Sequence, residues 1–104
     1  MNIWALDKAT EIKALLLQLR ERLIPESWVL VSEKKFGDRQ SVRIHSANEP
    51  SLAAYISLHG QTPGHFGVHL EYPVFEVANR FDNTQIAENL NEEKTLELLV
   101  MHLG

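Results

Sequence analysis

The sequence predicts an α+β fold, with one helix near each end of the chain and an antiparallel sheet between them. Apolar residues recur at helical spacing in residues 8–24 and again in residues 92–103. Between these segments, short stretches of β-branched, aromatic or alternating apolar and polar residues are separated by turn residues. A chain of 104 residues is expected to form a single domain, residues 1–104, around one core.

Both expected helices have a start signal and an apolar stripe. The first helix is predicted to follow Asp7 as its N-cap and to stop at Pro25, because proline cannot continue helical hydrogen bonding. The second is predicted to follow Asn91, and the acids Glu92 and Glu93 favour its positive N-terminal end. The stripes expected to face the core are Ile12, Leu15, Leu16, Leu19 and Leu23, and Leu96, Leu99, Val100 and Leu103.

The middle of the chain indicates four or five strands. Strand-like composition marks residues 27–33, 40–46, 52–59 and 65–72. A fifth strand is predicted over residues 74–81, followed by a polar connection over residues 82–89. Because the connections are short, an antiparallel meander is expected. Two amphipathic helices need an apolar sheet face to cover, so both are expected on one face, which leaves the other for solvent or a partner.

A histidine-rich segment, SLHGQTPGHFGVHLEYP at residues 57–73, holds three of the five histidines. If residues 60–64 form its loop, the two flanking strands pair so that their apolar residues share one face. A slip of one residue would ruin this separation. The alternate residues then line the opposite face, namely Tyr55, His59, His65, His69 and Glu71, with Arg43 and His45 expected beside them.

A metal site is one interpretation of this segment. His59, His65, His69 and Glu71 are side chains that zinc accepts. However, His69 follows His65 by four residues, which corresponds to about 13 Å along a strand. Ligands of one ion must converge within about 2 Å of it. The spacing therefore predicts no metal site, and no other cofactor is expected.

Catalysis is a second interpretation, with Tyr55, His69 and Glu71 as general acid–base groups of a small histidine-dependent hydrolase or ribonuclease. The chain has no nucleophile elbow, glycine-rich phosphate loop or HExxH pattern, so no catalytic residue is assigned. In a third interpretation this face is either plain solvent-exposed sheet or a protein-binding platform, since tyrosine and arginine are favoured at interfaces. A structural or assembly subunit that pairs through an open sheet edge is a fourth.

Other residues are expected to have structural roles. Trp4 and Trp28 are interpreted as packing residues, and Lys34, Lys35 and Arg39 as the solvated tip of a hairpin. His102 is expected near the end of the last helix, where a cation favours the helix dipole.

The charge of the chain is uneven. Its formal net charge is −4, and residues 71–104 contain seven acids and two bases. An acidic surface disfavours nucleic acid and favours a basic protein partner, although acids also serve simply to keep a small protein in solution. The chain has no cysteine, no apolar run long enough to cross a membrane and no evident signal peptide, so a cytoplasmic location is expected.

In size, layout and charge, the chain resembles the small immunity proteins of bacterial toxin–immunity systems. The resemblance covers the whole chain and includes no specific motif. It implies a cytoplasmic protein, free as a monomer or in a 1:1 complex, that binds and blocks one cognate toxin domain, often a nuclease. The residues expected to contact such a toxin are Tyr55, His59, His65, His69, Glu71, Glu76, Asp82 and Glu88.

Overall fold

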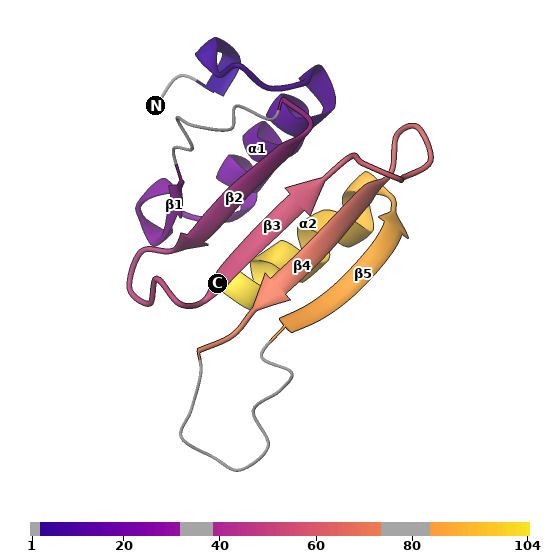
Figure 1. Cartoon of the computed structure of the whole chain (residues 1–104). Coiled ribbons are helices and arrows are strands. Elements are labelled where there is room, and N and C mark those ends of the chain that lie inside the picture. Colours follow the sequence, from indigo (N-terminus) through magenta and orange to yellow (C-terminus); the bar gives the residue numbers. More distant parts are fainter. Residues whose placement is uncertain (1–2, 32–38, 74–83) are drawn as a thin grey trace.

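The computed structural model describes residues 3–31, 39–73 and 84–104. This part of the chain contains two α-helices and five strands (Figure 1). In chain order they are α1 (Thr10–Arg22), β1 (Trp28–Leu30), β2 (Ser41–Ser46), β3 (Ala53–Ser57), β4 (Phe66–Glu71), β5 (Thr84–Leu90) and α2 (Glu92–Leu103). Short 3₁₀ turns at Ile3–Ala5 and Pro25–Ser27 precede α1 and β1.

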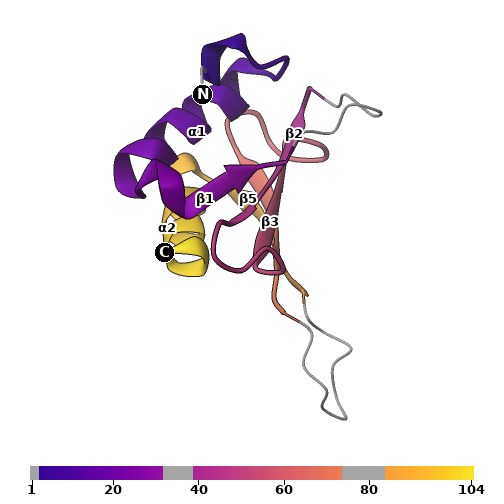
Figure 2. The same cartoon turned by 90° about the vertical axis from the view of Figure 1, so that its left-hand side faces the viewer.

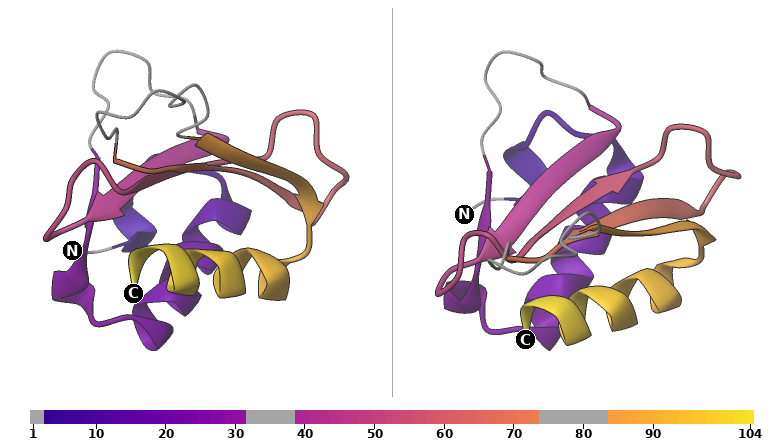
Figure 3. Two further views of the ribbon diagram at one scale, coloured as in Figure 1. Left: turned by 90° about the horizontal axis from the view of Figure 1, so that it is seen from below. Right: turned by 60° about the horizontal axis from the view of Figure 1, so that its bottom comes forward.

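The strands form one antiparallel meander in the order β1-β2-β3-β4-β5. Both helices lie on the same side of this sheet (Figures 2 and 3). The predicted α+β layout is therefore confirmed. We call the opposite side of the sheet, which neither helix covers, the open face.

The core lies between the sheet and the two helices. The stripe of α1 contributes four fully buried residues, and α2 contributes three that are at most 4% exposed. These residues are Ile12, Leu15, Leu16 and Leu19, and Leu96, Leu99 and Leu103. They pack against the inward side chains of the sheet, Val42, Ile44, Ala54, Ile56, Phe66, Val68 and Leu70. Each fully buried leucine or isoleucine contributes about 1.5–3 kcal/mol relative to an exposed one, so this layer holds the helices to the sheet.

The central hairpin pairs as the alternation predicts. Tyr55 lies opposite His69, Ile56 opposite Val68, and Ala54 opposite Leu70. Ala54, Ile56, Val68 and Leu70 are at most 3% exposed. The separation of the two faces thus fixes the register in the folded chain.

The two helix starts differ in how well local sequence predicts them. Asn91 is the N-cap of α2, and its side chain accepts a hydrogen bond of 2.8 Å from the N–H of Lys94. The prediction for Asp7 is wrong, because α1 begins at Thr10 after Ala9, without a side-chain cap. A tertiary bond decides this start, since the N–H of Ala9 donates to the carbonyl of Arg39 at 2.7 Å. Asp7 forms an ion pair with the Arg39 side chain.

The polar connection predicted over residues 82–89 is also wrong. Residues 84–90 form β5, which pairs with β4 at the edge of the sheet. Backbone pairing with β4 decides this strand, although its own sequence is mostly polar. A shift in register between Phe66 and Val68 marks a bulge, near which Asn89 has a positive φ of 52°. The strand predicted over residues 74–81 lies outside the described residues.

Two further packing predictions need correction. Trp28 is buried, as expected, but Trp4 is 57% exposed because Ile3, at 2% exposed, is the neighbour that turns inward.

His102 does lie in the last turn of α2, but it is only 8% exposed. Its Nε2 lies 2.7 Å from the carbonyl oxygen of Ala53. The residue therefore joins α2 to β3, in addition to any effect on the helix dipole. Lys34 and Lys35 lie outside the described residues.

Candidate functional site

A row of side chains crosses the open face from β2 to β5. Arg43 lies opposite Tyr55, Tyr55 opposite His69, and His69 opposite Ile86. Side chains of a strand alternate between the two faces, and the neighbours of Arg43, Tyr55 and His69 within their strands are buried in the core. The row therefore belongs to the open face and combines a cation, a phenol, an imidazole and an aliphatic group.

An ion pair ties this row to the next one. Both terminal nitrogens of Arg43 donate to Glu71, with Nη1 bonded to Oε2 and Nη2 at 3.1 Å from Oε1. The side chains are 34% and 30% exposed. Two parallel bonds of this kind are stronger and more directional than single neutral ones. The pair therefore holds two long side chains in fixed positions on the open face.

Tyr55 and His69 form an aromatic pair in the middle of the row. Their ring centroids are 5.9 Å apart and their planes meet at 64°. This edge-on arrangement suits the opposite charges of a ring's face and edge. Tyr55 is half-buried and His69 is exposed. The half-buried Tyr55 thus anchors the aromatic pair in the sheet, and the exposed His69 remains accessible to solvent or to a partner.

Two apolar residues on the open face were missed by the sequence analysis. Ile86 on β5 is 59% exposed, and Val29 on β1 is 41% exposed and lies opposite His45. Ile86 was missed because its segment was predicted to be a connection. The signal available in the sequence was an isolated isoleucine between polar residues, which is weak evidence for a strand.

The structure does not bring the histidines together. His69 lies on the row, while His59 is exposed in the turn after β3. His65 is half-buried and lines a hollow at the end of the hairpin that also includes Glu11 of α1. His45 places its Nδ1 2.8 Å from the carbonyl oxygen of Ser46. Within residues 3–31, 39–73 and 84–104, no group of three or more histidines and acids could hold a metal ion.

The hairpin loop is fastened to β5 by two reciprocal hydrogen bonds. The N–H of Asn89 donates to Oε1 of Gln61 at 2.6 Å, and the N–H of Thr62 donates to Oδ1 of Asn89 at 2.9 Å. Gln61 passes close to Gly67, where an added Cβ would lie 2.8 Å from its Nε2. A glycine at this position lets the loop close over the end of the sheet.

The candidate acids have different surroundings. Glu71 is engaged by Arg43, and Glu88 is exposed on the edge strand β5. Glu76 and Asp82 lie outside the described residues. On the helical side, Glu93 accepts two hydrogen bonds from Arg22, at 2.7 and 3.0 Å. These bonds lower the pKa of Glu93 and raise that of Arg22.

Comparisons with known proteins found no relatives of this chain. No protein family, curated protein or solved structure matches it. In the part that the structure describes, neither helix is both long and apolar enough to cross a membrane.

Proposed function

We propose that this chain is an immunity protein, which binds and neutralises a cognate bacterial toxin domain in the cytoplasm. In this proposal the toxin domain is a nuclease with a basic active-site cleft. The chain binds it through the open face and the neighbouring edge strand β5, as a 1:1 complex, and thereby blocks access of nucleic acid to the cleft.

The observation that carries the proposal is the row of Arg43, Tyr55, His69 and Ile86 across the open face. Tyrosine and arginine are enriched at protein interfaces, where a few such residues supply most of the affinity. Ile86 adds exposed apolar surface at the end of the row. These side chains lie on strands, so they offer one continuous surface to a partner.

Rigidity also favours a binding role. The ion pair of Arg43 with Glu71 and the two bonds between the hairpin loop and Asn89 hold parts of this surface in place before any partner arrives. Groups that are already ordered lose less conformational entropy on association. A prearranged surface of this kind supports tight binding.

Charge supports a basic partner. The net charge of the chain is −4, and Glu88 on β5 is exposed beside the row. Attraction between an acidic inhibitor and a basic cleft raises the rate of encounter, and salt weakens this effect. Rapid capture is an advantage when the partner is toxic.

The surroundings of Glu71 favour binding over catalysis. A histidine that acts as a general base needs a neighbour that orients it. Glu71 uses both carboxylate oxygens to accept bonds from Arg43. It is therefore held as a structural partner of Arg43 and does not orient His69.

The test uses a candidate toxin domain encoded by a neighbouring gene, with binding measured by calorimetry and neutralisation by nuclease activity. Replacing Tyr55 and Ile86 together, as Tyr55→Ala and Ile86→Ser, is expected to weaken binding by about 30-fold or more, because an interface hot spot contributes about 2 kcal/mol. The control is Glu97→Gln on α2, which removes an exposed acid from the opposite side of the molecule.

The control variant is expected to bind as the wild type does. Circular dichroism spectra identical to the wild type would show that both proteins are folded. The proposal is wrong if the adjacent toxin domain does not bind, or if the double variant binds and protects with unchanged affinity.

A further inference from the structure

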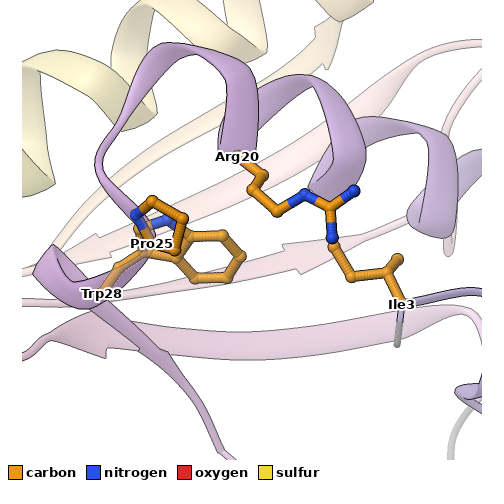
Figure 4. A pocket seen from close by; sticks show the side chains of 4 residues that line it. All are labelled: Ile3, Arg20, Pro25 and Trp28. Carbon is orange, nitrogen blue, oxygen red and sulfur yellow. The ribbon is translucent and has the colours of Figure 1, made fainter. Parts of the chain in front are cut away.

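A hollow of about 350 Å³ lies beside α1, away from the row on the open face. Ile3, Arg20, Pro25 and Trp28 line it (Figure 4). In Figure 4, Arg20 extends from α1 towards Ile3, and Pro25 and Trp28 lie on the other side of Arg20. Pockets for small ligands span about 300–1,000 Å³, so this hollow suits a small molecule.

Three of the four residues that line the hollow are apolar. Ile3 is 2% exposed and Trp28 is 7% exposed, so the core holds both. Pro25 begins the 3₁₀ turn before β1 and has a fixed φ. An indole ring, a pyrrolidine ring and a branched aliphatic side chain together form a surface that suits a flat apolar group.

Arg20 differs from the other arginines that the structure describes. Arg22, Arg39 and Arg43 each form an ion pair with a carboxylate. Arg20 has no hydrogen bond or ion pair in the described part of the chain. Its guanidinium carries a fixed charge and a planar set of donors that matches a carboxylate.

Trp28 also has an unmet hydrogen-bonding group. Its indole Nε1 is buried and has no acceptor in the part of the chain that the structure describes. Buried donors of this type are normally paired with protein or ordered water. Trp28, which lines the hollow, therefore carries a donor that has no acceptor among the described residues.

We propose that this hollow binds a small organic acid, with an aromatic or branched apolar body and one carboxylate. The body packs against Ile3, Pro25 and Trp28, and the carboxylate pairs with Arg20. Binding of this acid is separate from toxin binding, because the two use different residues. Either proposal can fail without affecting the other.

The probe for this site is 4-phenylbutanoate, and the matched ligand is 4-phenylbutanamide, which has the same body without the charge. Binding is followed by ¹⁵N NMR and calorimetry on the whole chain. The acid is expected to bind with a dissociation constant on the order of 1 mM or lower, and the amide about tenfold more weakly. The indole N–H signal of Trp28 is expected to shift, whereas that of the exposed Trp4 stays in place.

The matched variants are Arg20→Gln and Arg22→Gln, each of which removes one positive charge from α1. Only Arg20 lines the hollow, so only Arg20→Gln is expected to weaken binding of the acid to the level of the amide. Preserved NMR spectra establish that both variants are folded. The proposal is overturned if acid and amide bind equally, if both variants lose the same affinity, or if no probe gives a saturable shift.

Discussion

Arg43 and Glu71 form a two-point ion pair that crosses a whole strand of the sheet. They lie on β2 and β4, which are separated by β3, and their side chains meet above it. By register, Arg43 lies beside Tyr55 and Glu71 beside Ala53. The side chain of Ala53 faces the same way and is fully buried, so a small residue here leaves room for the crossing.

We expect this ion pair to stabilise the fold measurably. In a double-mutant cycle with Arg43→Met and Glu71→Gln, the coupling energy should be about 1 kcal/mol, because the pair is partly buried and is joined by two parallel hydrogen bonds. Urea unfolding of the four proteins measures it. The control cycle uses Arg39 and Asp7, whose side chains are 68% and 82% exposed, and should give a coupling close to zero. Equal couplings in the two cycles would contradict the prediction.

The layer between α2 and the sheet should be sensitive to lost volume. Leu99 is fully buried, so Leu99→Ala is expected to lower the free energy of unfolding by about 2–5 kcal/mol. Met101, two residues along the same helix, is 81% exposed. Its replacement by alanine should change stability by no more than about 0.5 kcal/mol. Thermal or urea unfolding checks both, and comparable losses would contradict the burial of Leu99 against the sheet.

The N-cap of α2 gives a local prediction. Asn91→Ala removes the acceptor for the N–H of Lys94 and should cost about 1 kcal/mol of stability. Asn91→Asp and Asn91→Ser keep a capping oxygen and should retain most of it. The comparison separates the cap from a general effect of substitution at this position. Full stability of the alanine variant would mean that the cap contributes nothing.

The ion pair between the helices predicts a pH dependence. Hydrogen bonds from Arg22 lower the pKa of Glu93 below its ordinary value of 4.5. A group whose pKa is lower in the folded state stabilises the protein above the unfolded pKa. That contribution is lost as the pH falls through the folded value. Hence the wild type should be more stable than Glu93→Gln at pH 7, and this difference should vanish in acid.

Urea midpoints of the two proteins at several pH values would measure this difference. Glu21→Gln serves as the control, since Glu21 is an exposed acid on α1 and has no ion pair among the described residues. Its stability relative to the wild type should change less between neutral and acidic pH. A stability difference for Glu93→Gln that persists at low pH would contradict the assigned ion pair.

The sequence was a good guide where one pattern governed many residues. Alternation through the central hairpin excludes a one-residue slip, and the loop at residues 60–64 sets the remaining register, so the pairing of Tyr55 with His69 could be predicted. The same register placed Glu71 on the open face, and the alternation within residues 40–46 placed Arg43 on that face too. The stripes of both helices and the Asn91 cap were likewise local features. These determined the fold class, the two faces and most of the central row.

Tertiary structure decided the features that depend on distant backbone. The start of α1 depends on a bond from Ala9 to Arg39, and β5 is a strand because its backbone pairs with β4. Neither contact leaves a periodic signal in the sequence. The packing of α2 on β3 likewise determines that His102 is buried. Local propensity and periodicity report on neighbours along the chain, whereas these positions obtain their hydrogen bonds from residues far away in sequence.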